Sequence, residues 1–266
     1  MSEAGSSAGE AKPRRRIQGA LPFLCVLALW QAACSFGWVN TYLLPSPLRV
    51  ARAEAAAALS GELGHHVAAS SLRVLGGFAI AVALALPAAA LASLAPRLLS
   101  ALGPLLAFLR NIPPLALVPV LILWLGIGEA SKIALIVLAS FFPAFLGAAT
   151  GLSGVDPRLA EMGRSVGLSR WQILVRVLLP ESVPSLANGL RLGLGYGWRA
   201  LVGAEMVAAA SGLGYWILDS EEMARIDSVF AGILTIGVLG IVLDRAALAA
   251  ARRLAPWAHL ENSWQA

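Results

Sequence analysis

Long apolar segments separated by short polar connectors occupy most of this chain of 266 residues. A helix of about 20 apolar residues is about 30 Å long, which matches the hydrocarbon thickness of a bilayer. Six segments of the chain reach that length: residues 17–38, 72–94, 105–126, 133–152, 186–210 and 228–250. The pattern therefore predicts an all-α, polytopic membrane protein with six transmembrane helices.

Polar stretches divide the chain around these spans. Residues 1–16 are rich in serine and glycine and end in a basic cluster, which is typical of a disordered tail. Residues 39–71 form a connector, in which the alanine-rich stretch 51–63 predicts a short helix outside the membrane. Residues 72–250 are expected to form the core of the protein, and residues 251–266 a second tail.

Prolines interrupt the second, third and fourth predicted spans. Pro87 interrupts the second span and Pro143 the fourth, while Asn111, Pro113 and Pro114 lie together in the third. Each proline removes one intrahelical hydrogen bond. Because a helix broken at membrane depth is tolerated only where it faces protein or a watery cavity, we expect broken spans here. Asn111, Pro113 and Pro114 are therefore candidates for the lining of a translocation path.

The fifth predicted span carries closely spaced glycines and two charged residues. Gly189, Gly193 and Gly197 recur every four residues, which predicts a close approach to another helix. Arg199 and Glu205 are charges at membrane depth, and each should face a partner or a water-filled path. For Arg199 the alternatives are a site for an anion such as a sulfonate or carboxylate, and a structural pair with a carboxylate elsewhere. For Glu205 we favour a structural role near the outer gate.

Residues 156–184 form a polar island between the fourth and fifth apolar spans. Asp156 followed by Pro157 is typical of a helix N-cap with proline at the first helical position. Gly167 can supply the left-handed backbone that ends this first short helix.

A second short helix is predicted directly after Gly167. Ser169 and Gln172 have the spacing of a capping box, and Pro180 is expected to stop the helix. Apolar residues such as Trp171 follow at helical spacing. The island is therefore predicted to be a helix–turn–helix with an apolar face that its own spans need not cover.

Composition and charge support a membrane protein and orient it. The chain is 58% hydrophobic and 13% charged, which is unlike a soluble domain. Its net charge of +5 comes without an aromatic-interleaved basic patch or a Gly-rich phosphate loop, so we expect neither nucleic-acid binding nor nucleotide hydrolysis by this chain. With an inner N-terminus, six spans place both termini and the island in the cytoplasm. The basic residues that are then inside include Lys12, Arg14, Arg15, Arg16, Arg97, Arg158, Arg164, Arg170, Arg176, Arg252 and Arg253; this fits the positive-inside rule.

No residue set in the sequence predicts a metal site, a cofactor or a catalytic centre. His65 and His66 are neighbours that point about 100° apart on a helix, and no third ligand is near them. We therefore expect interfacial histidines and no bound metal. The predicted spans contain no paired carboxylates, Ser/His arrangement or metal cluster, so an intramembrane enzyme is not favoured.

The island resembles the coupling-loop signature of ABC-importer permeases. That signature is a glutamate, two small residues, a glycine four positions later, and an aliphatic-x-Leu-Pro end. The residues that match it or lie within it are Glu161, Met162, Gly163, Arg164, Gly167, Leu168, Val177, Leu179 and Pro180. Met162 and Gly163 replace the usual paired alanines. Further stretches from about residue 44 to residue 253 are similar to the nitrate, taurine, alkanesulfonate and thiamine-precursor branch; they include 44–47, 70–74, 111–116, 124–132 and 212–214.

The resemblance implies a bacterial inner-membrane importer built from two permease copies, two cytoplasmic ATPase subunits and a periplasmic solute-binding protein. In such an importer the island, residues 156–184, sits in a groove of the ATPase, and the permease carries no catalytic site of its own. A small, anionic solute is expected to cross at the homodimer interface. The alternative is an ion-driven secondary transporter, which can also use broken helices but needs no ATPase.

Overall fold

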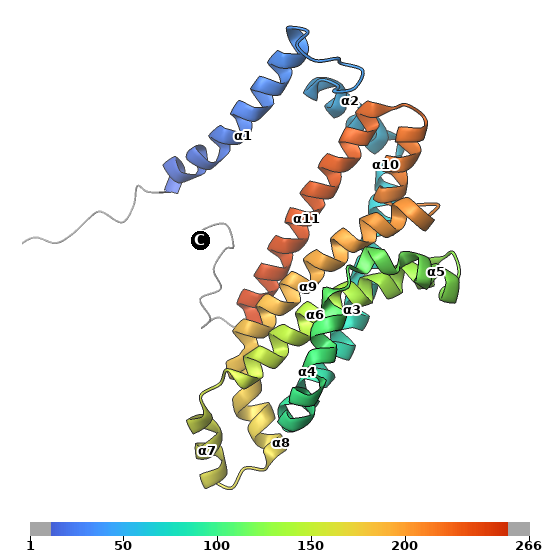
Figure 1. Cartoon of the computed structure of the whole chain (residues 1–266). Coiled ribbons are helices and arrows are strands. Elements are labelled where there is room, and N and C mark those ends of the chain that lie inside the picture. The colour runs from blue at the N-terminus through green and yellow to red at the C-terminus, as the bar shows by residue number, and fades with distance from the viewer. Residues whose placement is uncertain (1–11, 255–266) are drawn as a thin grey trace, which may run out of the picture.

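The computed structural model describes residues 12–254, and every regular element within them is helical (Figure 1). The long helices form an elongated bundle; α7 and α8 project from one end of it, and α2 and α10 lie at the other. In chain order the elements are α1 (Lys12–Ser35), α2 (Pro47–Ser60), α3 (Glu62–Leu94), α4 (Pro96–Asn111), η1 (Pro114–Leu117), α5 (Val118–Leu125), α6 (Glu129–Ser153), α7 (Pro157–Ser165), α8 (Arg170–Ile173), η2 (Leu174–Leu178), α9 (Leu179–Ala208), α10 (Leu213–Glu222) and α11 (Ile226–Leu254).

Three helices, α3, α6 and α11, are each long and apolar enough to cross a membrane. Two further pairs of helices pass the same test together, although each pair is bent. Ser100–Asn111 and Pro114–Leu125 meet at 84°, and Arg170–Ala208 meets α10 at 43°. The described residues thus hold up to five candidate spans. The apolar part of α1 in this count, Leu24–Ser35, is shorter than a span.

Helices α6 and α9 approach each other closely through glycine, as the spacing of Gly189, Gly193 and Gly197 predicts. A Cβ atom placed on Gly189 would lie 2.6 Å from the Cα of Gly147, and one on Gly193 would lie 2.9 Å from the Ser140 carbonyl oxygen. Gly197 faces the Ser140 side chain and Ile136. Because backbone touches backbone here, larger residues would force the two helices apart.

Helix α3 packs against α6 through small residues on one face. Gly77, Ala81, Ala85 and Ala89 recur every four residues and all are buried. A Cβ on Gly77 would lie 2.8 Å from the Ile136 Cβ. This dense seam, together with the seam between α6 and α9, makes α3, α6 and α9 the centre of the bundle.

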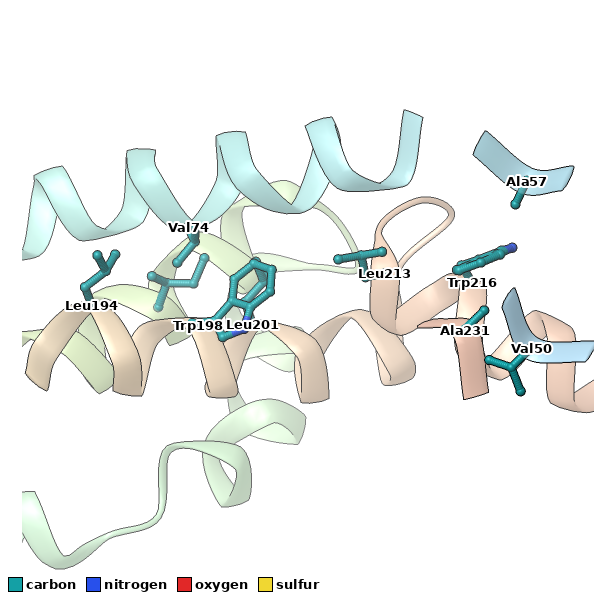
Figure 2. Packing of buried hydrophobic residues seen from close by; sticks show 10 residues of the cluster. Val50, Ala57, Val74, Leu194, Trp198, Leu201, Leu213, Trp216 and Ala231 are labelled. Carbon is teal, nitrogen blue, oxygen red and sulfur yellow. The ribbon is translucent and has the colours of Figure 1, made fainter. Parts of the chain in front are cut away.

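Larger side chains form a core at the end of the bundle that carries α2 and α10. Trp216 of α10, Trp198 of α9 and Val50 of α2 belong to one buried cluster, in which Trp216 is 1% exposed (Figure 2). Trp30 of α1 packs on the edge of this cluster, with its ring 5.8 Å from that of Phe230 in α11. The rest of α1 extends away from the bundle (Figure 1).

The expected breaks at three prolines are wrong. Pro87 lies inside the continuous helix α3, and Pro143 lies inside α6. Proline fixes φ near a helical value, so the loss of one hydrogen bond need not end a helix that neighbouring helices hold in place. Pro180 likewise does not stop the second island helix, which continues through η2 into α9. Residues 174–178, shortly before this proline, form a π-helical turn.

The third predicted span does break at its prolines, but it is not a straight crossing. Helix α4 ends at Asn111, and the chain turns through Ile112 and Pro113 before η1 and α5. The second predicted span also differs, because α3 begins at Glu62, ten residues before the expected start at Leu72. Gly61, at φ 83°, separates α3 from α2. Residues 1–11 and 255–266 lie outside the described residues, and with them most of both predicted tails.

Candidate functional site

The first short helix of the island, α7, starts and ends at the residues that the sequence predicts. Asp156 caps α7, and its carboxylate accepts a hydrogen bond of 2.9 Å from the backbone N–H of Arg158. At the other end, Leu168 N–H donates to the Gly163 carbonyl and Gly167 N–H donates to the Arg164 carbonyl, both at 3.0 Å. These two bonds form a Schellman motif, and Gly167 has the left-handed φ of 80° that the motif needs.

The second island helix starts with the predicted capping box. Ser169 N–H donates to Gln172 Oε1 at 2.8 Å, and Gln172 N–H donates to Ser169 Oγ at 3.3 Å. The two short helices touch at Gly163, where a Cβ would lie 3.0 Å from Cγ1 of the buried Ile173. We call residues 156–184 the elbow. Capping at both helices and contact between them fix its shape.

Apolar side chains on the elbow are left open. Met162, Val166 and Trp171 are 65%, 75% and 64% exposed. Glu161 and Arg164 beside them are also exposed. The other residues of the signature differ from one another: Leu168 and Val177 are half-buried, whereas Leu179 and Pro180 are exposed. The exposed apolar face that the sequence predicts is therefore present, and nothing in residues 12–254 covers it.

A cavity of about 690 Å³ lies in the groove between the end of α4, η1, α6 and α9. Asn111 and Pro114, two of the candidates from the sequence, are among its lining residues. Pro113, Arg199 and Glu205 are not among its lining residues. The sequence analysis missed Arg110, which lines the cavity beside Asn111. The feature of the sequence that could have identified Arg110 is its charge, because it lies inside the third predicted span, residues 105–126.

Arg199 lies on an exposed face of α9 and not in an ion pair with another residue of 12–254. Its guanidinium carbon stands 5.2 Å from the centre of the Tyr196 ring, and Tyr196 lines the cavity. The structural alternative for Arg199, a carboxylate elsewhere in the same bundle, is therefore not found in the described residues. The alternative of an anion site remains.

Glu205 is 1% exposed and is the centre of a buried polar network. It accepts hydrogen bonds from the Ser70 hydroxyl at 2.8 Å, from Arg73 Nη1 at 2.8 Å and from the Gly214 N–H at 3.1 Å. The Ser70 hydroxyl also accepts from Leu213 N–H at 2.9 Å. Sequence reasoning required a partner for this carboxylate but did not identify it, because Arg73 is 132 residues away.

Arg73 extends this network to the start of α6 and to the turn before α10. Its Nε and Nη2 donate to both carboxylate oxygens of Glu129 at 2.7 and 2.8 Å, and Nη1 donates to the Ser211 carbonyl at 2.7 Å. Glu129 also pairs with Lys132, three residues further along α6, at 2.8 Å. We call Ser70, Arg73, Glu129, Glu205 and Ser211 the outer clasp.

The two histidines are not both interfacial. His66 is buried, stacks near Trp216 and accepts a hydrogen bond of 3.1 Å from the Gly212 N–H on Nδ1. Within residues 12–254 no group of three or more His, Cys, Asp or Glu side chains could hold a metal ion. His66 thus helps to hold the turn between α9 and α10.

Apolar helices around a cavity, with an exposed elbow at one end, define a polytopic membrane protein of the transport class. Residues 81–256 match the family described as "Binding-protein-dependent transport system inner membrane component". The chain belongs to this family.

Relatives that cover most of the chain agree with this family. The chain is 35% identical to the aliphatic sulfonates transport permease protein SsuC of Bacillus subtilis, over 100% of this chain and 96% of the relative. It is 35% identical to the taurine transport system permease protein TauC of Escherichia coli, over 87% and 86%. It is 30% identical to the nitrate import permease protein NrtB of Synechocystis, over 91% and 94%.

The fold agrees as well. A structure of the MetNI methionine ABC transporter in an inward-facing conformation aligns with a TM-score of 0.61 over 70% of this chain and 92% of the other, at 18% identity. The protein is thus a multi-pass inner-membrane permease subunit of an ABC importer, and an ion-driven transporter is not favoured.

Proposed function

We propose that this permease works as a homodimer that imports a small anion, driven by a separate cytoplasmic ATPase that binds the elbow. Each copy would cross the membrane six times: α1, α3, the pair α4–α5, α6, α9 with α10, and α11. Both termini and the elbow would face the cytoplasm, and the permease would have no catalytic site of its own. A periplasmic binding protein would deliver the solute to the opposite end.

The shape of the elbow is the observation that carries this proposal. Its two short helices are capped at Asp156 and Ser169, locked at Gly167 and packed together at Gly163. The second helix continues without a break from Arg170 to Ala208. A push on the elbow would therefore move α9 as one rigid element, whereas a flexible loop would absorb it.

The exposed apolar residues of the elbow supply the docking surface. Contact with water is unfavourable for the apolar side chains of Met162, Val166 and Trp171, and a partner that covers them would remove this cost. Large exposed apolar patches of this kind mark interaction sites. In this family the second position of the signature is usually alanine. The longer Met162 would reach further into the ATPase groove without changing the spacing of Gly167 and Pro180.

The class of solute follows from the relatives and from the charges of the path. The three relatives are named for aliphatic sulfonates, taurine and nitrate. Sulfonates and taurine carry a negatively charged sulfonate group, and nitrate is itself an anion. Arg199 stands exposed on α9 next to the cavity. These observations support a small anion as the solute.

The elbow is tested by Met162→Asp, with Met223→Asp as the matched control. Both methionines are similarly exposed, at 65% and 61%, but Met223 lies at the opposite end of the bundle, after α10. A charge in an apolar contact should cost several kcal/mol, so we expect about a tenfold or greater loss of ATPase copurification with Met162→Asp. The Met223→Asp variant should copurify normally.

The coupling step is tested by Glu161→Ala and Gly167→Pro in proteoliposomes that contain the ATPase and the binding protein. Proline cannot adopt the φ of 80° at Gly167, so this variant should distort the elbow while α9 still inserts. Both variants should lose the stimulation of ATP hydrolysis by substrate. Full stimulation in both would show that the elbow has no special part in coupling.

A further inference from the structure

We infer that Arg110 forms an anion-binding position inside the permease, through which a sulfonate-like or carboxylate-like solute passes after it leaves the binding protein. This inference rests on the proposed function and names a residue for it. The occupant is a small organic monoanion that pairs with the guanidinium in the cavity between α4, α6 and α9.

The charge of the cavity wall is the first argument. Among the lining residues, all within the described part of the chain, Arg110 is the single charged side chain, and none is acidic. No ion pair within residues 12–254 involves Arg110, although it belongs to a segment, Ser100–Asn111, of a candidate span. A charge in such a segment is costly unless it faces a partner or a watery path. We therefore expect the partner of the Arg110 guanidinium to be a ligand in the cavity.

The contrast with two half-buried arginines, Arg73 and Arg191, strengthens this argument. Arg73 and Arg191 each pair with a carboxylate, Glu205 or Glu129 for Arg73 and Asp244 for Arg191. These pairs hold helices together and leave no positive charge for a ligand. Arg110 has no such pair, and its place at the last turn of α4, next to the break at Ile112, leaves its guanidinium at the open groove.

Neutral hydrogen-bond donors lie opposite Arg110. Ser185, Asn188 and Tyr196 of α9 line the same cavity at helical spacing. None of these three side chains makes a hydrogen bond to another part of residues 12–254. An anion next to the guanidinium could accept bonds from them, as charged oxygens of sulfonates and carboxylates do. A cation would meet one positive charge and no carboxylate.

Arg199 continues this face of α9 beyond the cavity. It follows Tyr196 by three residues and holds its guanidinium over the Tyr196 ring. Asn188 and Arg199 are eleven residues apart, about 16 Å along a helix. Arg110 of α4 and Arg199 of α9 therefore place two positive charges along this route, and no acidic side chain lines the cavity.

The inference is tested by the charge preference of a reporter thiol in the cavity. The full chain, purified with its ATPase, carries Leu192→Cys together with Cys25→Ser and Cys34→Ser, which remove the native thiols. Leu192 lines the cavity and is 51% exposed. In phosphatidylcholine vesicles, whose zwitterionic headgroups carry no net charge, the thiol is modified by a methanethiosulfonate that bears either a sulfonate or a trimethylammonium group.

We expect the sulfonate reagent to react faster, and Arg110→Gln to lower the ratio of the two rates about tenfold, the effect of one partly screened unit charge a few ångströms away. Arg110→Lys should preserve the ratio. Arg97→Gln, which removes a charge that is also exposed but lies outside the cavity, should leave the ratio unchanged. Millimolar ethanesulfonate should slow modification at least twofold, and the same concentration of tetramethylammonium should not.

An unchanged ratio in Arg110→Gln, or no protection by ethanesulfonate, would overturn the inference. The assay requires neither ATP hydrolysis nor a binding protein. Loss of ATPase copurification in the elbow variants therefore bears on the proposed function alone, and the two can fail separately.

Discussion

Arg73 joins three parts of the protein that the chain brings together only in the folded state. Its guanidinium pairs with Glu205 of α9 and with Glu129 at the start of α6, and it also holds Ser211 before α10. The Arg73 and Glu205 side chains are 10% and 0% exposed. A buried ion pair adds little net stability, but one partner left alone is strongly destabilising. We therefore expect the outer clasp to be needed for correct packing of the bundle end that carries α10.

Removal of Arg73 is therefore expected to be costly, and removal of both charges much less so. Arg73→Met should lower the free energy of unfolding by about 3–5 kcal/mol because the Glu205 carboxylate stays buried without its cation. Adding Glu205→Gln should recover part of that loss. Thermal unfolding of the purified variants in detergent measures both effects.

The pair Arg225–Asp219 supplies the matched control at the residue scale. These side chains are 41% and 25% exposed and lie 3.1 Å apart. Arg225→Met should cost no more than about 1 kcal/mol, as exposed pairs do. If Arg73→Met were equally mild, the outer clasp would have no structural importance.

At the scale of elements, the packing of α6 on α9 depends on glycine rather than on large side chains. Gly147 and Gly189 face each other, and each lacks room for even one added carbon. Lipid tails are as apolar as leucine, so burial of apolar surface does not drive helix association in a membrane. Close backbone contact therefore supplies much of the attraction between these two helices.

Gly189→Ala should weaken this contact. The added Cβ would meet the Gly147 backbone at 2.6 Å, and overpacking of this kind costs about 1–3 kcal/mol. Gly237→Ala in α11 is the matched control, because nothing lies within 4 Å of that position. Its higher helix propensity predicts no loss or a gain of up to about 1 kcal/mol. Equal melting temperatures for the two variants would contradict the glycine seam.

Signals within a few residues of one another were sufficient to predict several elements. The caps at Asp156, Gly167 and Ser169 and the spacing of Gly189, Gly193 and Gly197 all appear in the structure. Such features depend on local backbone geometry, which the sequence states directly. The predicted helix breaks at Pro87 and Pro143 were wrong because they depend on distant contacts: neighbouring helices decide whether a proline breaks a helix.

The candidate site was predicted less completely than the fold because its contacts join distant residues. Glu205 meets Ser70 and Arg73 across more than 130 residues of sequence. The 84° bend after Asn111, which helps to shape the cavity, depends on how α5 packs against α6. Arg110 could be recognised as a candidate site residue only once the cavity was known, because the sequence does not show what a single arginine in an apolar stretch faces.

At the scale of the whole molecule, charge separates the two ends of the bundle. The elbow carries Arg158, Arg164, Arg170 and Arg176, whereas α10 at the other end carries Asp219, Glu221 and Glu222. Cytoplasmic loops of membrane proteins carry the excess of arginine and lysine. Under this rule the charge distribution favours a cytoplasmic position for the elbow, which the proposed docking of the ATPase requires.

Thiol labelling in intact cells tests this orientation directly. In a background of Cys25→Ser and Cys34→Ser, Met162→Cys places a thiol on the elbow and Met223→Cys places one after α10, at positions 65% and 61% exposed. A maleimide that cannot cross membranes should label the Met223→Cys variant in spheroplasts. It should label the Met162→Cys variant only after permeabilisation, since six crossings from an inner N-terminus keep the elbow inside. The reverse pattern would place the elbow outside the cell, where no ATPase could reach it, and both the six-span topology and the coupling proposal would fail together.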